Sequence, residues 1–135
     1  MVDDNPGDIR LVKEALQDSH IQHILHCVHN GEEALSYLHQ KREAEYFTKP
    51  DLILLDLNLP KKNGRQVLEE IKQDKKICDI PVVILSSSRS KDDIVQMYEL
   101  GAHSYIPKPE TLDNFTDLVQ EIEKFWMNLP ASPSE

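Results

Sequence analysis

The stretch that decides the fold is Asp51-Leu-Ile-Leu-Leu-Asp-Leu-Asn-Leu-Pro60. Its short apolar run, residues 52–55, lies between two prolines, which is typical of a strand buried on both faces in a parallel sheet covered by helices. Asp56 follows this run directly, and a bare carboxylate is costly to bury unless it meets water, a partner or a metal ion. Because ligands of open α/β sheets bind beyond the carboxyl ends of the strands, we expect Asp56 to be the centre of the functional site.

Length, charge and cysteine content narrow the class of protein. At 135 residues the chain is most simply one domain, and its net charge of −9 disfavours non-specific binding to nucleic acid, which needs a basic face. No apolar run approaches the roughly 20 residues that span a bilayer, and the acidic opening does not resemble a signal peptide. We therefore expect a cytoplasmic protein in which Cys27 and Cys78 are free thiols.

Outward from the central stretch, apolar strands alternate with amphipathic helices. This alternation predicts right-handed βαβ units, a parallel sheet and a three-layer α/β/α sandwich. Besides 52–55, the predicted strands are 24–28, 80–85 and 104–106, and the predicted helices carry apolar stripes at 9–16, 34–38, 67–71, 94–98 and 115–126. We expect one folded domain over residues 1–127 and a flexible tail over 128–135.

Polar side chains follow the ends of three predicted strands. Asp56, Ser86 and Lys108 occupy these ends, and the start of the first helix adds Asp3 and Asp4. Three carboxylates close together repel one another, and a hard divalent cation such as Mg²⁺, which prefers oxygen ligands, removes that cost. A carboxylate nucleophile, a metal site, a lysine and a hydroxyl donor make a complete set for phosphoryl transfer.

Each of these residues has a simpler interpretation when it is read alone. The acidic pair suits the start of any helix, Ser86 could be an ordinary loop residue, and Lys108 could be a solvated surface lysine. Asp56 at the end of a buried apolar strand is harder to explain in that way. The joint arrival of these residues at successive strand ends favours a site.

A zinc site is a competing interpretation of the histidine-rich segment. His20, His23, His26 and His29 surround Cys27 at intervals of three. Helical spacing would bring them together, but the segment is predicted to be loop and strand, where the two-residue period separates neighbours in this series onto opposite faces. Surface and loop histidines are the preferred interpretation.

Four motifs, in this order, resemble the receiver domains of two-component response regulators, which have the CheY-like fold. The resemblance spans nearly the whole chain and implies a flavodoxin-like, five-stranded parallel sheet in the order 2-1-3-4-5. The motifs are Val2-Asp-Asp4, Leu54-Leu-Asp-Leu-Asn-Leu-Pro60 with Gly64, Pro81-Val-Val-Ile-Leu-Ser86, and Gly101-Ala-His-Ser-Tyr-Ile-Pro-Lys-Pro109.

The resemblance assigns roles at the predicted phosphorylation site. It implies that Asp56 is the phosphoacceptor and that Lys108 pairs with the phosphoryl group. It implies Mg²⁺ as the cofactor, held by Asp3, Asp4, Asp56 and the backbone carbonyl of Asn58. The expected reaction is attack by Asp56 on the phosphohistidine of a partner sensor kinase, with no other enzymatic activity than self-phosphorylation from phosphodonors and autodephosphorylation.

The resemblance also assigns a conformational switch. It implies that Ser86 is the switch hydroxyl and Tyr105 the switch aromatic, with Asn58 and Ser88 at positions that tune the rate of dephosphorylation. It further implies a cis peptide bond between Lys108 and its following proline. Phosphorylation would then change the surface of the last two helices and the last strand, which a partner reads.

A narrower resemblance points to the stand-alone regulators that are paired with cyanobacterial phytochrome kinases. It is carried by Asn5-Pro-Gly-Asp-Ile-Arg-Leu-Val12, by Leu57-Asn-Leu-Pro-Lys-Lys-Asn-Gly-Arg65 and by Ile122-Glu-Lys-Phe-Trp126. This implies a phytochrome as the kinase and a homodimer through the last helix and strand region. The aromatic pair that ends the last motif could make that contact or could close the core.

The chain departs from the family pattern at its start. Receivers have a longer apolar run before the acidic pair, whereas here only Met1 and Val2 precede it. We therefore expect a truncated first strand, which leaves backbone groups of its neighbours unpaired. Either the sequence starts late in the domain or residues of another chain fill the gap.

Two functions of other classes compete with the phosphoacceptor. A receiver-like interaction module that takes no phosphate would lack a key residue, and here all are present. A metal-dependent aspartate phosphatase would need a general-acid carboxylate two residues after the nucleophile, where this chain has Asn58.

Overall fold

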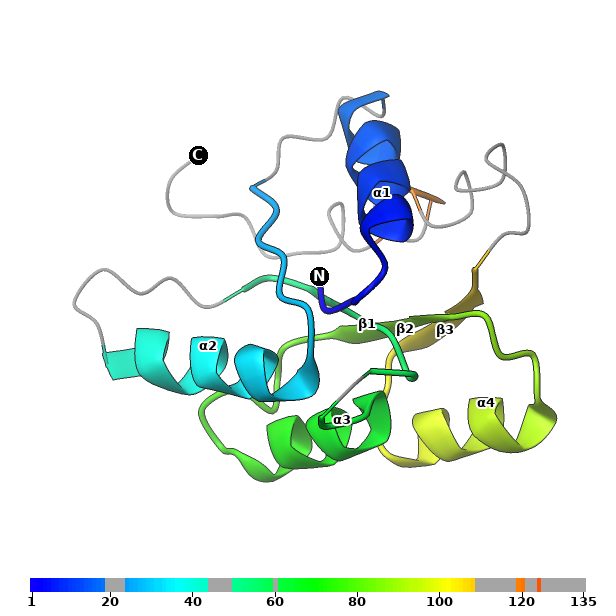
Figure 1. The fold of residues 1–135 in the computed structure, drawn as a ribbon. Coiled ribbons are helices and arrows are strands. Elements are labelled where there is room, and N and C mark those ends of the chain that lie inside the picture. The colour runs from blue at the N-terminus through cyan, green and yellow to red at the C-terminus, as the bar shows by residue number, and fades with distance from the viewer. Residues whose placement is uncertain (19–23, 44–49, 60, 109–118, 121–123, 125–135) are drawn as a thin grey trace.

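Helices and strands alternate over residues 31–107 as the sequence predicts, whereas the described residues between the first two helices form no strand (Figure 1). The computed structural model describes residues 1–18, 24–43, 50–59, 61–108, 119–120 and 124. The elements are α1 (Pro6–Asp18), α2 (Gly31–Glu43), β1 (Ile53–Leu55), α3 (Gly64–Gln73), β2 (Val82–Ser86), α4 (Lys91–Glu99) and β3 (Ser104–Pro107).

The three strands form a parallel sheet in the order β1-β2-β3. Leu54 is opposite Val83 in one pair of strands, and Ile84 is opposite Tyr105 in the other. On the free side of β1, Val2 makes single parallel bridges to β1 and to the segment that precedes α2. When Val2 and Val28 are counted as the first and second strands, the strands lie side by side in the order 2-1-3-4-5 that the family resemblance implies.

The predicted strand over residues 24–28 is much shorter than expected. Only Val28 forms a β-bridge, through its N–H to the Met1 carbonyl at 3.0 Å and its carbonyl to the Asp3 N–H at 3.1 Å. The His26 carbonyl accepts a further hydrogen bond from the Met1 ammonium at 2.7 Å. Ile24 is 85% exposed. A ladder extends only as far as its shorter partner, and the partner here offers a single bridging residue, Val2. In the described residues the sheet therefore has three strands, with single-residue bridges at Val2 and Val28 beside them.

Hydrophobic clusters cover the two faces of the sheet. Side chains of β1 alternate between them, because successive residues of a strand point to opposite faces. Leu55 joins apolar residues of α2, α3 and α4 in one cluster, whereas Leu54 packs with Val12 and Leu16 of α1 in the other. Figure 1 shows α1 on one side of the sheet and the other three labelled helices on the opposite side, which gives the predicted layers. The predicted last helix lies largely outside the described residues, as do the tail and the bond between Lys108 and the following proline.

No helix in the described ranges has the length and apolar character needed to cross a membrane. Both cysteines, Cys27 and Cys78, are free thiols and are partly buried, in agreement with the expectation from the sequence.

A capping box begins α3 at the point where the loop after β1 turns back onto the sheet. The Asn63 side chain accepts a hydrogen bond from the Gln66 N–H at 3.0 Å, and the Gln66 side chain accepts one from the Asn63 N–H at 3.1 Å. Each bond satisfies a backbone donor that the helix itself leaves unpaired. This helix holds the apolar face that packs under β1, so the cap contributes to the position of the loop that follows Asp56.

Replacing the capping residue should measure this contribution. We expect Asn63→Ala to lower the free energy of unfolding by about 1 kcal/mol, determined by urea denaturation. Arg65→Ala, an exposed position one residue into the same helix, is the matched control and should change stability by less than about 0.5 kcal/mol. Equal losses in the two variants would contradict a specific role for the cap.

Candidate functional site

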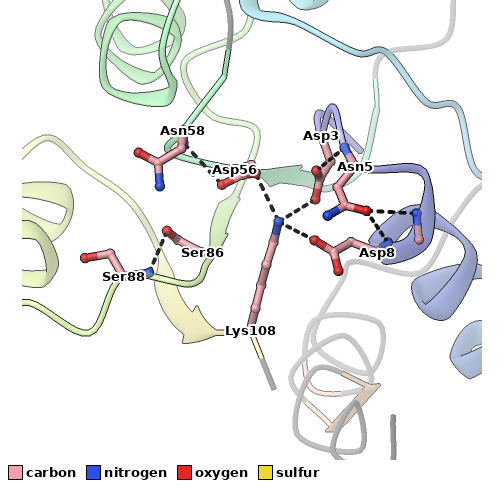
Figure 2. A network of polar contacts seen from close by, with 9 residues as sticks. Asp3, Asn5, Asp8, Asp56, Asn58, Ser86, Ser88 and Lys108 are labelled. Carbon is pink, nitrogen blue, oxygen red and sulfur yellow. Dashed lines mark hydrogen bonds and ion pairs between the residues drawn. The ribbon is translucent and has the colours of Figure 1, made fainter. Parts of the chain in front are cut away.

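Three parallel strands deliver their polar residues to one edge of the sheet. Asp56 directly follows β1, Ser86 ends β2, and Lys108 directly follows β3. Backbone hydrogen bonds fix the edge: the Lys108 N–H donates to the Ser86 carbonyl at 2.7 Å, and the Asp56 N–H donates to the Val2 carbonyl at 3.0 Å. The predicted convergence at the carboxyl ends of the strands is what the structure shows (Figure 2).

The ammonium group of Lys108 lies among three carboxylates. Its Nζ donates hydrogen bonds to Oδ2 of Asp8 at 2.8 Å and to Oδ2 of Asp56 at 3.0 Å. It also forms an ion pair with Oδ2 of Asp3 at 2.9 Å. All four side chains are largely withdrawn from water, so these charges interact more strongly than surface pairs do.

Asp8 was not among the residues predicted from the sequence. It lies in the first turn of α1, where an acidic residue is ordinarily explained by the helix dipole. Asp4 precedes the helix, so no helical spacing links Asp8 to the acidic pair, and the sequence carries no signal that identifies it.

The Asn5 side chain caps the start of α1. Asn5 Oδ1 accepts hydrogen bonds from the N–H groups of Gly7 at 2.9 Å and Asp8 at 3.2 Å. The Asn5 N–H donates in turn to Oδ1 of Asp3 at 2.9 Å. One short segment therefore orients two of the carboxylates that face Lys108.

Burial and charge set the protonation preferences of the site. Burial raises the pKa of Asp56, and hydrogen bonds from Lys108 and from the Asn58 N–H oppose that effect without cancelling it. Burial alone would lower the pKa of Lys108, but its hydrogen bonds to Asp8, Asp3 and Asp56 outweigh burial and raise that pKa above its ordinary value. Lys108 is therefore a fixed positive charge at any physiological pH.

Three carboxylates form a group that could hold a metal ion. Oxygen atoms of Asp3, Asp4 and Asp56 lie within 4.8 Å of one another, and no other such group of acidic, histidine or cysteine side chains occurs in the described part of the chain. Asp3 is 1% exposed, and its Oδ2 forms an ion pair with the Lys108 ammonium at 2.9 Å. A cation offsets the cost of holding several carboxylates close together, and an all-oxygen donor set suits a hard divalent one. The residues present therefore fit a divalent metal.

The site opens into a cavity of about 510 Å³. Its lining includes the acidic residues Asp4, Asp8 and Asp56, and also Asn58 and Arg89. A small anionic group carried by another molecule could reach Asp56 through this opening, where Lys108 and a metal ion would meet its charge.

Comparison with known proteins identifies the family. The model of the response regulator receiver domain matches residues 1–120. The chain belongs to the response regulator receiver domain family. It is 44% identical over 134 residues to the response regulator Rcp1 of Synechocystis, which covers 99% of this chain and 91% of the relative.

Solved receiver structures resemble this one over almost their full length. The phosphorylated cyanobacterial phytochrome response regulator RcpA has a TM-score of 0.83 and 48% identity, over 98% of this chain and 94% of that one. The Mn²⁺-bound form of Rcp1 has a TM-score of 0.83 and 45% identity, over 98% and 95% of the two chains. The fold is therefore the CheY-like, flavodoxin-like α/β fold, and the protein is a response regulator of two-component signalling.

In this receiver, the predicted switch residues are linked through the loop between β2 and α4. Ser86 is fully buried, and its Oγ accepts a hydrogen bond from the Ser88 N–H at 3.2 Å. The Tyr105 hydroxyl donates to the Ser88 carbonyl at 2.8 Å, and the Ser88 hydroxyl donates to Asp93 at 2.6 Å. Arg89 ties the same loop to the chain after β3, through a hydrogen bond to the Lys108 carbonyl at 3.0 Å.

The histidine-rich segment shows no zinc site in its described part. His26 stacks on Tyr37 with ring centroids 5.6 Å apart, and His29 lies 3.8 Å from Glu33. His20 and His23 lie outside the described residues.

Proposed function

We propose that Asp56 accepts a phosphoryl group from the phosphohistidine of a sensor kinase. The observation that carries this proposal is the contact between Asp56 and Lys108 at 3.0 Å beside the acidic group that could hold a metal. We propose Mg²⁺ as that metal, with Asp3, Asp4, Asp56 and the Asn58 carbonyl as protein ligands. When bound, the metal would neutralise charge on the transferring oxygens.

The geometry gives each residue a task in the transfer. Asp56 Oδ1 accepts the Asn58 N–H at 3.2 Å and Oδ2 accepts Lys108, so the carboxylate is oriented before a donor arrives. One carboxylate oxygen forms the new bond to phosphorus, while the bond from phosphorus to the imidazole nitrogen breaks and that nitrogen keeps the electron pair. Lys108 then donates hydrogen bonds to the phosphoryl oxygens, as a fixed cation placed where negative charge gathers.

We propose that the signal leaves the site through the loop after β2. The buried Ser86 hydroxyl would turn to a phosphoryl oxygen, which ends its hydrogen bond with the Ser88 N–H. Because the Tyr105 hydroxyl holds the Ser88 carbonyl, movement of this loop changes the exposed surface of α4 and β3. Asn58 lines the cavity beside Asp56 and Ser88 lies in the loop after β2, and we propose that they set the rate of hydrolysis of the phosphoryl group.

We propose that the partner kinase is of the phytochrome type. The support is that the similar structure of RcpA is described as a cyanobacterial phytochrome response regulator. A further structure, 36% identical over 98% of this chain and 80% of its own, is described as a bacteriophytochrome response regulator. A homodimer through the last helix stays a prediction, since that helix lies largely outside the described residues.

Labelling with and without metal tests the proposal. Incubated with acetyl phosphate and Mg²⁺, the protein should gain one phosphoryl group, detected by intact-protein mass spectrometry. Removal of Mg²⁺ with EDTA should reduce the rate by about a hundredfold or more, since the metal supplies several kcal/mol of charge stabilisation in phosphoryl transfer. Equal labelling with and without the metal would contradict the proposed metal site.

The labelling experiment and a phosphatase assay separate the proposed function from its two competitors. No labelling in a folded sample with Mg²⁺ would favour a phosphate-independent interaction module. Continuous release of phosphate from a generic phosphatase substrate would favour an aspartate phosphatase. The residue two positions after Asp56 is Asn58, which cannot act as the general acid of such an enzyme.

A further inference from the structure

Asp8 contacts the central lysine of the site but is not one of the residues that could hold the metal. Its Oδ2 lies 2.8 Å from Lys108 Nζ, and the side chain is 23% exposed. The Asn5 cap fixes its backbone in the first turn of α1, from which the side chain points toward Lys108 (Figure 2). This contact joins two elements that are 100 residues apart in the sequence.

The hydrogen bonds of the Lys108 ammonium explain why a further carboxylate matters. An ammonium has three N–H donors and no acceptor. Here the group faces Asp3, Asp8 and Asp56. Two of these, Asp3 and Asp56, are the same carboxylates that a metal ion would need. In the arrangement shown, Lys108 and a metal therefore compete for the same oxygens.

Asp8 offers Lys108 a partner outside that competition. When Asp3 and Asp56 turn to a metal ion, the ammonium would otherwise lose its partners in a largely buried position, and leaving a buried charge unpaired is costly. With Asp8 present, the ammonium keeps one hydrogen-bonded anion and has donors free for a phosphoryl oxygen.

We propose that Asp8 is a positioning residue that draws the Lys108 ammonium away from Asp3 and Asp56 as the metal binds, and holds it beside the phosphoryl position. The proposal rests on the proposed function of this site. It predicts that loss of Asp8 weakens Mg²⁺ binding, because Lys108 then has only the metal ligands as partners.

The simpler explanation of Asp8 is an acidic residue that stabilises the start of a helix. That role predicts a small change in stability and no change in metal affinity. Two substitutions separate the positioning role from the helix-start role. Asp8→Asn keeps the size and a hydrogen-bond acceptor but removes the charge, whereas Asp8→Glu keeps the charge.

Calorimetric titration of Mg²⁺ into the metal-free protein is the test. We expect Asp8→Ala and Asp8→Asn to weaken Mg²⁺ binding by about tenfold, at the lower end of what residues behind the direct ligands contribute. Asp8→Glu should recover most of the loss. The matched control is Glu14→Gln, which removes one negative charge from the same helix, where Glu14 pairs only with the exposed Arg10. It should bind Mg²⁺ as the wild type does.

The outcomes distinguish this inference from the proposed function. If the wild type binds Mg²⁺ and the Asp8 variants bind it equally well or more tightly, the positioning role is wrong and the metal site stands. If Glu14→Gln weakens Mg²⁺ binding to the same degree, the effect comes from net charge alone and the positioning role of Asp8 is wrong. If the wild type binds no Mg²⁺, both the proposed metal site and the role of Asp8 fail.

A measurement on the wild type alone keeps the inference testable should the Asp8 variants not fold. The reactivity of Lys108 toward acetic anhydride, followed by mass spectrometry, should stay low when Mg²⁺ is added, because Asp8 retains the ammonium. A large rise in acetylation at Lys108 on adding Mg²⁺ would show that nothing holds it and would overturn the inference.

Discussion

Asp56→Asn should take up no phosphoryl group from acetyl phosphate or from a kinase, to the limit of detection by intact-protein mass spectrometry. The asparagine side chain is nearly the same size but has no anionic oxygen to attack phosphorus. The matched control is Asp51→Asn, the same substitution at an exposed residue just before β1, which should be labelled as the wild type is. Undiminished labelling of Asp56→Asn would refute the assignment of the phosphoacceptor.

The loss should not come from unfolding. Burial raises the pKa of Asp56, so the folded state disfavours its ionised form. A carboxyl group with a raised pKa stabilises the fold at low pH, and that contribution is lost as the pH rises through its folded-state pKa. At neutral pH and without metal, Asp56→Asn removes this unfavourable charge and leaves Lys108 paired with Asp3 and Asp8. Its thermal midpoint should therefore equal or exceed that of the wild type.

Gly64→Ala should lower the free energy of unfolding by about 3 kcal/mol, the upper part of the range for overpacked sites. A Cβ at this position would overlap the Asp56 carbonyl oxygen and lie 2.7 Å from the Leu57 Cα. Both are backbone atoms, which cannot rotate aside as a side chain can. The loop that carries Asp56 would have to move, so labelling should slow as well as stability fall.

A second glycine provides the matched comparison, with both variants measured by urea denaturation. A Cβ on Gly7 would meet only the Asn5 Oδ1 atom at 3.2 Å, and the helix gains about 1 kcal/mol when glycine becomes alanine. Gly7→Ala should therefore differ from the wild type by less than about 1 kcal/mol. Similar losses in the two variants would show that the close approach of Gly64 to the backbone after β1 carries no special cost.

The sequence predicts the convergence of these side chains where strand geometry alone decides it. Asp56, Ser86 and Lys108 each end a short apolar run, and parallel strands must bring such ends together. Gly101 follows the end of α4 with a φ of 102°, which side chains disfavour and glycine adopts readily. These predictions depend on the local residue pattern and on the rule that the carboxyl ends of parallel strands lie at one edge of the sheet.

Other features depend on contacts that no local pattern shows. The strand expected over residues 24–28 has the right composition but lacks a partner of matching length, and only Val28 forms a β-bridge. Asp8 looks like a helix-dipole acid until Lys108 is placed next to it. In each case the deciding group comes from a distant part of the chain.

The backbone around Lys108 has a consequence for attempts to engineer this regulator. Its N–H donates to the carbonyl of Ser86 at the end of β2, and its carbonyl accepts from Arg89 in the loop after β2, so the backbone of Lys108 is attached both to that strand and to that loop. The proposed output surface and the proposed catalytic cation are therefore coupled through the hydrogen bonds of the Lys108 backbone. If these proposals hold, a change to that loop that recruits a new output will also change the rates of phosphorylation and dephosphorylation.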